Sequence, residues 1–116
     1  MGDVTQDIPS DDWRAHFDEL SRSAAAAEVT IEIAGADVGD QISADRLALT
    51  GISYDDKDDI LVVGLDAPGG SPEEYQHLIS EPRQIQVATM GDGQTTYDVT
   101  DGDGRQHLIR IRSAKP

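Results

Sequence analysis

The sequence predicts an α+β fold with a mainly antiparallel sheet or a small barrel. Apolar residues near the N-terminus recur at helical spacing, whereas most of the remaining chain consists of short segments in which apolar and polar residues alternate. Turns rich in glycine and aspartate separate these segments, and the predicted order of elements is α-β-β-β-α-β-β-β. Since only one connection between strands contains a helix, neighbouring strands are expected to run antiparallel.

The first helix is predicted over residues 10–27. Trp13, Phe17, Leu20 and Ala24 recur at spacings of four, three and four, which places them on one stripe of the helix. Trp13 and Phe17 are therefore expected to lie in the core. If the helix lay on the outside of the sheet, these two residues would instead be candidates for partner binding, because large aromatic side chains dominate the energy of many interfaces.

Strands are predicted from alternating or continuous apolar residues over 29–34, 46–54, 60–65, 85–89, 95–99 and 106–112. In the second of these segments the apolar positions change parity at Gly51. A glycine inside such a run indicates a β-bulge that resets the register.

A second helix is predicted from residue 72 to about residue 79. A capping box with proline at the first helical position is formed by Ser71, Pro72 and Glu74. Tyr75, Leu78 and Ile79 would give this helix one apolar side, and Pro82 would end it.

The 116 residues indicate a single domain spanning residues 1–116, with flexible ends at 1–9 and 113–116. The absence of cysteine excludes disulfides and thiolate metal sites and fits a reducing compartment. No apolar run approaches the roughly 20 residues of a membrane span, and the acidic N-terminus does not resemble a signal peptide. A cytoplasmic location is therefore expected.

The net charge of −14 comes from 23 acidic and 9 basic residues. Such a field repels phosphate backbones and anionic lipids, so neither nucleic acid nor membrane is expected as a partner. A genome that favours arginine over lysine, or a salty cytoplasm, would each explain the acidity. A third explanation is an acidic mimic of nucleic acid that occupies a basic protein.

Four aspartates stand between two predicted strands, namely Asp55, Asp56, Asp58 and Asp59. Carboxylates on one loop could supply some of the six to eight oxygens that Ca²⁺ requires. The loop lacks the glycine and the final glutamate of an EF-hand, however. The pattern is therefore interpreted as the charged tip of a hairpin, and no metal is expected there.

A second acidic turn contains Asp98, Asp101 and Asp103 around the sequence DGDG. Arg105 and Arg112 occupy positions where a calcium loop would carry ligands. Asp-Gly pairs are typical of tight hairpins, so this segment is also interpreted as a turn. The two acidic turns together could hold a cation only if they lay at the same end of the sheet.

Three histidines are present, His16, His77 and His107, and none has the spacing of a zinc-binding helix. His16 is expected to be solvated because it lies off the apolar stripe, and His77 is expected in the second helix. Any of the three could meet an aspartate in space and form a general-base pair. No nucleophile elbow, phosphate loop or dinucleotide fingerprint occurs, so no catalytic residue and no cofactor is predicted.

Five segments of the chain resemble, in order and spacing, a family of small prokaryotic proteins of unknown function. They are IPSDDWRAHFDELSR, VTIEIAGADVGDQ, LALTGISYDDKDDILVV, HLISEPRQIQV and DGDGRQHLIRIR. The chain departs from this family at AAAAE, where the family is bulkier and more aromatic. The resemblance implies no reaction, ligand or catalytic residue.

The sequence thus predicts a small non-enzymatic protein that acts through an unidentified protein partner or through self-association. The first alternative is a protein that binds divalent cations through its acidic loops. The second alternative is the acidic mimic of nucleic acid.

Overall fold

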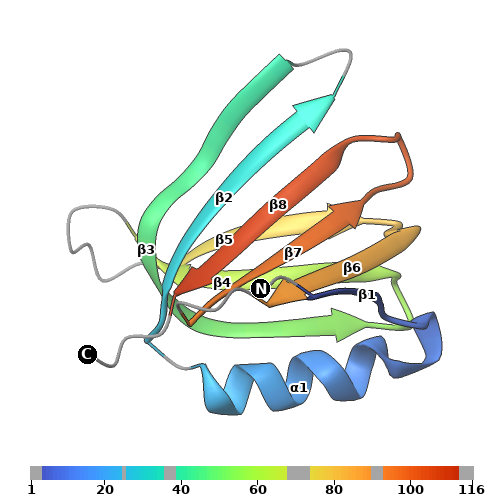
Figure 1. The fold of residues 1–116 in the computed structure, drawn as a ribbon, viewed down its shortest axis with the longest axis horizontal. Helices are drawn as coiled ribbons and strands as arrows, with labels where there is room; N and C mark the ends of the chain where they lie inside the picture. Colours follow the sequence, from blue (N-terminus) through green and yellow to red (C-terminus); the bar gives the residue numbers. More distant parts are fainter. Residues whose placement is uncertain (1–3, 25, 36–38, 68–73, 90–92, 113–116) are drawn as a thin grey trace.

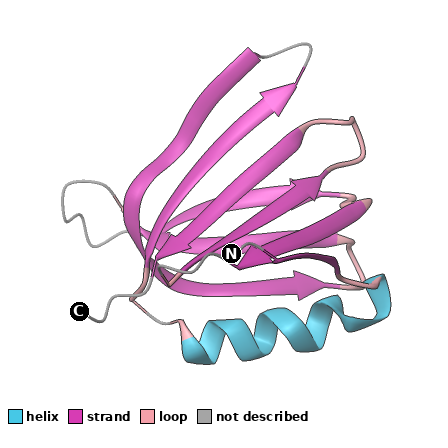
Figure 2. Cartoon of the chain, in the orientation of Figure 1, coloured by secondary structure: helices cyan, strands magenta, loops and turns pink. Residues whose placement is uncertain are grey.

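A computed structural model describes residues 4–24, 26–35, 39–67, 74–89 and 93–112 of the chain (Figure 1). Its elements are β1 (Val4–Asp7), the 3-10 turn η1 (Ser10–Asp12), α1 (Trp13–Ser23), β2 (Glu28–Gly35), β3 (Gly39–Asp55), β4 (Ile60–Asp66), β5 (Glu74–Ser80), β6 (Gln84–Thr89), β7 (Gln94–Thr100) and β8 (Gln106–Arg112). Most of the described chain is therefore strand, with one helix beside it (Figure 2).

The strands form an antiparallel sheet in the order β1-β6-β7-β8-β2-β3-β4-β5, which does not close into a barrel. The first half of β3 pairs with β2, whereas its second half pairs with β4. The sheet bends along β3, so β5 comes to face β8, as a contact between His77 and His107 demonstrates. The result is two layers of sheet that share one long strand.

The core lies between these layers and is closed on one side by α1. Trp13 is 4% exposed and packs edge-to-face on Tyr54 of β3, with ring centroids 5.2 Å apart. Phe17 is fully buried and contacts Tyr97 of β7 at 5.4 Å. The predicted apolar stripe is confirmed, and the alternative partner-binding role of Trp13 and Phe17 is wrong because both side chains lie inside the core.

The helix is shorter than predicted, since α1 ends at Ser23 rather than at residue 27. Ala26 adopts a left-handed conformation with φ of 68°. Its N–H donates to the carbonyl of Leu49, and the N–H of Leu49 donates to the carbonyl of Ala27. Pairing with β3 therefore overrides the high helix propensity of the alanine run.

The second predicted helix is wrong, because these residues form strand β5. Every residue of β5 pairs with β4, from Ile60 opposite Ser80 to Asp66 opposite Glu74. Tyr75, His77 and Ile79 face inward, and the residues between them are exposed. The capping residues Ser71 and Pro72 lie outside the described residues.

The predicted flexible N-terminus is ordered from Val4, because β1 pairs with β6 from Val4 opposite Thr89 to Asp7 opposite Gln86. The carbonyl of Ile8 then accepts a hydrogen bond of 2.8 Å from the indole Nε1 of Trp13. This bond ties the start of the chain to the core. Residues 1–3 and 113–116 lie outside the described part.

The bulge predicted at Gly51 is confirmed, since the register between β3 and β4 shifts between Leu49 and Gly51. The remaining predicted strands are also present, and all strand pairs are antiparallel as expected. No helix in the described part of the chain is long and apolar enough to cross a membrane.

Candidate functional site

A continuous set of hydrogen bonds joins four side chains between β5, β8 and the first half of β3. The Oγ of Ser43 lies 3.1 Å from Nδ1 of His77, and Nε2 of His77 lies 3.0 Å from Nδ1 of His107. Nε2 of His107 then lies 2.8 Å from Oδ2 of Asp101. We call Ser43, His77, His107 and Asp101 the polar chain. His77, His107 and Asp101 are buried, and Ser43 is half-buried.

Local irregularities of the backbone place both ends of the polar chain. Ser43 is an extra residue in β3, because Ile42 pairs with Glu32 while Ala44 pairs with Ile31. Such a bulge re-aims a side chain, and here it directs Ser43 toward β5. At the other end, Oδ1 of Asp101 accepts the N–H groups of Asp103 and Arg105 at 2.9 and 3.0 Å.

The ionisation of Asp101 determines which atom donates and which accepts in each hydrogen bond of the polar chain. Burial raises the pKa of Asp101, but the hydrogen bonds from His107, Arg105 and Asp103 outweigh it, so this pKa lies below its ordinary value. The ionised carboxylate can only accept, which makes Nε2 of His107 a donor and, in the neutral ring, Nδ1 an acceptor. By the same reasoning His77 donates to His107 and accepts the hydroxyl proton of Ser43.

Burial, reinforced by the neighbouring His107, lowers the pKa of His77 to about 4. His77 is therefore neutral at physiological pH. A neutral ring keeps one nitrogen free to accept a proton, which is what the hydroxyl of Ser43 requires. Tyr75 completes the arrangement, because its hydroxyl lies 3.1 Å from the Oγ of Ser43.

The two histidines meet in a geometry that suits a shared proton better than a shared metal ion. Their nitrogens are 3.0 Å apart and their ring centroids 5.2 Å apart, so each nitrogen points almost directly at the other. A metal bound by both rings would lie about 2.0–2.1 Å from each nitrogen, beside the line that joins them. Within the described chain, no three histidine or acidic side chains are grouped to hold a metal ion.

A cavity of about 420 Å³ opens onto the middle of the polar chain. His77, His107 and Asp101 form its polar wall, and Ile33 and Leu78 form apolar parts of the lining. Arg105 adds a positive charge to this lining. Gln41 of β3 also lines the cavity, whereas Ser43 is not part of its lining.

The two acidic turns lie at the same end of the molecule. The N–H of Glu81 donates to the carbonyl of Asp59 at 2.8 Å, and the N–H of Gly102 donates to the carbonyl of Ser80 at 3.5 Å. Several of their carboxylates nevertheless accept hydrogen bonds close to the turns. Oδ1 of Asp55 accepts the N–H of Lys57 at 2.9 Å, and Oδ1 of Asp59 accepts the hydroxyl of Tyr54 at 2.5 Å.

The other predicted acidic residues also lie apart. Asp56 is 3.7 Å from Arg14 on the helix, and Asp103 is 3.7 Å from Arg105. Asp58 is exposed, whereas Asp98 lies on β7 and is half-buried. The structure therefore brings Asp101 into the polar chain and leaves the remaining aspartates separate from it.

His16 is not solvated as expected, because it is half-buried between the helix and β7. Its Nε2 lies 2.7 Å from the hydroxyl of Tyr97, and its ring packs edge-to-face on Phe17. Burial lowers the pKa of His16 and raises that of Tyr97 to about 12. Both groups are thus neutral near pH 7, and the bond between them fixes the helix on the sheet.

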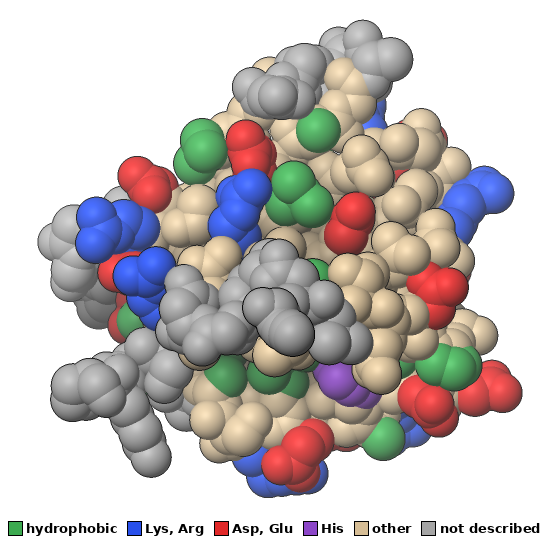
Figure 3. All heavy atoms as spheres, viewed as in Figure 1, with side chains coloured by type: hydrophobic (Ala, Val, Ile, Leu, Met, Phe, Trp, Pro, Cys, Tyr) green, Lys and Arg blue, Asp and Glu red, His purple; other side chains and the backbone are tan. Residues whose placement is uncertain are grey.

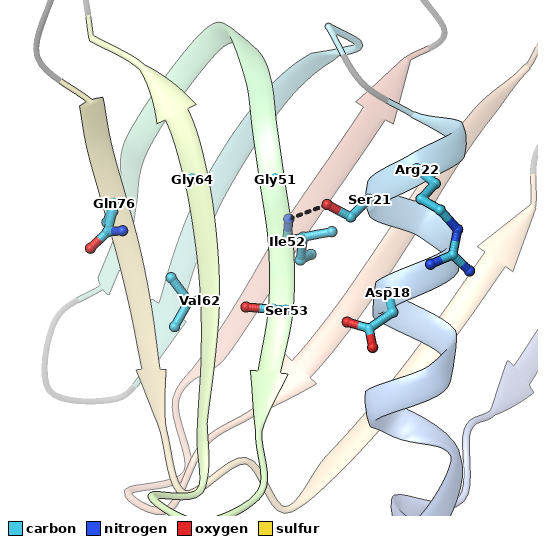
Figure 4. A pocket seen from close by; sticks show the side chains of 9 residues that line it. All are labelled: Asp18, Ser21, Arg22, Gly51, Ile52, Ser53, Val62, Gly64 and Gln76. Carbon is cyan, nitrogen blue, oxygen red and sulfur yellow. Dashed lines mark hydrogen bonds between the residues drawn. The ribbon is translucent and has the colours of Figure 1, made fainter.

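Another hollow, of about 360 Å³, lies beside the helix on the surface of β3, β4 and β5 (Figure 4). Gly51 and Gly64 form part of its floor, and Asp18 and Arg22 line the helix side. The Oγ of Ser21 accepts the N–H of Ile52 at 3.1 Å and so joins the helix to β3. This hollow contains no arrangement of acid, base and nucleophile comparable to the polar chain.

Comparison with known proteins places the chain in a family. A family model described as a family of unknown function, DUF5335, matches residues 4–116. The chain belongs to this family. An uncharacterised protein of Aquifex aeolicus (strain VF5) is 35% identical over 113 residues, which cover 97% of this chain and 96% of that protein. No solved structure matches. The resemblance predicted from the sequence blocks, to small uncharacterised prokaryotic proteins, is confirmed.

Sequence reasoning allowed for a histidine–aspartate pair in this DUF5335 member but did not identify which residues would form it. His107 follows Asp101 by six positions across a hairpin turn, a local signal that could have suggested their contact. The roles of Ser43 and His77 carried no such signal, because one depends on a bulge and the other on a strand that was predicted as helix.

Proposed function

We propose that this DUF5335 member acts by binding an extended segment of a protein partner along β5. The observation that carries this proposal is that, among the strands that the structure describes, β5 ends the sheet and pairs with β4 alone. In an antiparallel pair, every second residue forms its backbone hydrogen bonds with the neighbouring strand. Because the N–H of Glu81 donates to the carbonyl of Asp59, the backbone groups of Gln76 and Leu78 point away from β4, toward the edge of the sheet.

The edge of β5 lacks the usual features that prevent pairing. Exposed edges are commonly protected by lysine, proline or a bulge. Strand β5 contains no lysine or proline, and its register with β4 is continuous. Leu78 is 54% exposed, and Ile42, next to Ser43 on β3, is 59% exposed. An added strand would hydrogen-bond to the edge and cover Leu78.

The charge of the molecule favours a partner of different composition over a second copy. Between Tyr75 and Ser80 the only titratable groups are Tyr75 and His77, so the edge is a neutral strip on a chain of net charge −14. Two such chains repel each other at low salt. A neutral or basic strand of another protein meets no such repulsion.

The two alternative functions receive less support. Asp55, Asp59 and Asp101 of the acidic turns accept hydrogen bonds, and no group of three potential ligands occurs in the part of the chain that the structure describes. On the face shown in Figure 3, acidic side chains are scattered among basic ones rather than aligned along a ridge. A mimic of nucleic acid would be expected to present a continuous row of carboxylates.

A selection of displayed random peptides on the purified protein tests the proposal. We expect enrichment of uncharged or basic peptides with high β-propensity. Gln76→Pro should abolish their binding, because it removes an outward N–H while leaving the β4 ladder intact. Leu78→Lys should weaken binding, and Ile42→Lys, which adds the same charge at the other exposed apolar side chain, should not.

Two outcomes would contradict this function. Peptide binding that survives in folded Gln76→Pro would exclude the edge of β5 as the binding site. Sedimentation showing a dimer that Gln76→Pro dissociates would identify the partner strand as that of a second copy, against the charge argument above.

A further inference from the structure

We infer that Ser43 is a base-activated nucleophile that accepts a small acyl group from an activated ester, with His77 as its base. This activity goes beyond the proposed binding function and does not depend on it. The Oγ of Ser43 and Nδ1 of His77 are 3.1 Å apart and share a hydrogen bond. A hydroxyl and an imidazole in this contact are the first two members of a nucleophilic triad.

The rest of the polar chain fixes the base in its accepting form. Because Asp101 accepts from His107 and His107 accepts from His77, the free lone pair of His77 must face the serine. Nδ1 of His77 can take the proton of Ser43. The proton on Nε2 of His77 can then pass to Nδ1 of His107. The resulting imidazolium would lie 2.8 Å from the carboxylate of Asp101, which stabilises it.

Burying two histidine rings costs free energy, and this cost indicates that the polar chain has a role other than stabilising the fold. His77 and His107 are 7% and 5% exposed in a core that is otherwise largely aliphatic. Buried polar groups stabilise a fold little more than well-packed apolar residues do, and they destabilise it strongly when one partner is lost. Here a bulge, two buried rings and a hairpin carboxylate belong to one chain of hydrogen bonds that ends at a serine.

The surroundings of Ser43 provide access and a donor. Ser43 is half-buried, so part of its side chain reaches the surface. The cavity of about 420 Å³ opens on its base, His77, and its lining does not include Ser43 itself. The hydroxyl of Tyr75 lies 3.1 Å from the Oγ of Ser43 and donates to the backbone carbonyl of Ser43 at 3.3 Å. Turned away from that carbonyl, it would donate to an oxygen that becomes negative next to the serine.

The reaction balances without a cofactor. The Oγ of Ser43 forms a bond to the carbonyl carbon, and its proton passes to Nδ1 of His77. The bond from that carbon to the leaving oxygen then breaks, and the leaving alkoxide takes the proton from His77. Water, deprotonated by the same imidazole, hydrolyses the acyl-serine and restores the chain.

Labelling with a fluorophosphonate tests the inference, because this reagent forms an O–P bond to an activated serine and releases fluoride. We expect one label per wild-type molecule, located at Ser43 by peptide mass mapping. Ser43→Ala should abolish labelling, and Ser53→Ala, an exposed serine on the same strand, should leave it unchanged. His77→Gln should slow labelling at least tenfold, the lower range expected for loss of a general base.

Asp101 and His107 act through His77 and are positioning residues. Asp101→Asn should shift the pH profile of labelling, which a merely structural contact would not do. If His77→Gln does not fold, the wild-type protein alone is informative, since its labelling rate should fall as acid protonates the imidazole and should disappear in urea.

Three results would overturn the inference. They are absence of label on folded wild-type protein between pH 6 and 9, label distributed over several serines, and an unchanged rate in folded His77→Gln.

Discussion

His77 makes the stability of the molecule depend on pH. Burial holds its pKa at about 4 in the folded state, against 6.5 in the unfolded chain. The unfolded chain therefore binds a proton first as the pH falls. The contribution of His77 to stability is complete above pH 6.5 and is lost progressively as the pH falls toward 4.

We expect the free energy of unfolding to decline between pH 6.5 and 4 more steeply in the wild type than in His77→Gln. Urea titrations at several pH values measure this difference. Comparison with the variant separates His77 from the carboxylates, which titrate in the lower part of the same range. Parallel pH dependences in the two proteins would contradict the assignment of a buried, neutral His77.

Asp98 is a carboxylate whose hydrogen bonds are incomplete. Its Oδ2 accepts a long hydrogen bond of 3.5 Å from Gln106, whereas its Oδ1 is buried and has no hydrogen-bond partner among the described residues. Burial accordingly raises the pKa of Asp98 above its ordinary value. Since the folded state prefers the protonated form, this residue destabilises the fold at neutral pH, and the penalty disappears as the pH falls through its folded pKa.

Asp98→Asn should therefore stabilise the protein at pH 7 by about 0.5–1 kcal/mol, since it removes a poorly solvated charge. The difference should vanish near pH 3. Thermal unfolding at both pH values provides the measurement, with the exposed Asp103→Asn as the control. Destabilisation by Asp98→Asn at pH 7 would show that the carboxylate has a favourable partner.

At the scale of elements, the strands with clear alternation could be predicted from the sequence. Val29 and Ile31 alternate with polar residues, and the first four residues of β2 follow this pattern in their burial. Strand β5 could not be predicted in the same way, because Leu78 and Ile79 are adjacent and suggest a helical side. Leu78 is exposed, and only pairing with β4 shows that Tyr75, His77 and Ile79 form the inner face.

The same limit applies to the candidate site. Asp101 and His107 are close in sequence, so their contact was within reach of local reasoning. The contact between Ser43 and His77 joins residues 34 positions apart and requires the bend along β3. Non-local geometry of this kind leaves no periodic signal in a single sequence.

The hairpin between β7 and β8 contains a position that requires glycine. Gly104 has φ of +85°, a left-handed conformation that disfavours residues with a Cβ atom. Its N–H donates to the carbonyl of Asp101 at 3.1 Å, so this conformation helps to hold the carboxylate end of the polar chain.

Gly104→Ala should destabilise the protein by about 1–2 kcal/mol through backbone strain, because no neighbouring atom obstructs the added methyl group. Chemical denaturation tests this value. Gly51→Ala is an informative comparison, because its backbone is not left-handed and its new methyl would instead approach the Oγ of Ser21 at 3.3 Å. Equal stability of Gly104→Ala and the wild type would contradict the strained turn.

At the scale of the whole molecule, the net charge of −14 is a source of self-repulsion. Salt screens interactions between exposed charges beyond about 10 Å at 0.1 M. We expect the melting temperature to rise by several degrees between low and molar sodium chloride. Differential scanning calorimetry measures this shift, and a flat or falling melting temperature would argue against salt adaptation.

The sharing of β3 between the two layers has a consequence for cooperativity. A strand that pairs with β2 along one half and with β4 along the other cannot leave one layer without straining the other. Backbone amides of β2 and β4 should therefore exchange with solvent through the same global opening, and not as two separate folding units. The core strands of this protein would thus form one foldon, and its least protected amides would be found at the free edge of β5.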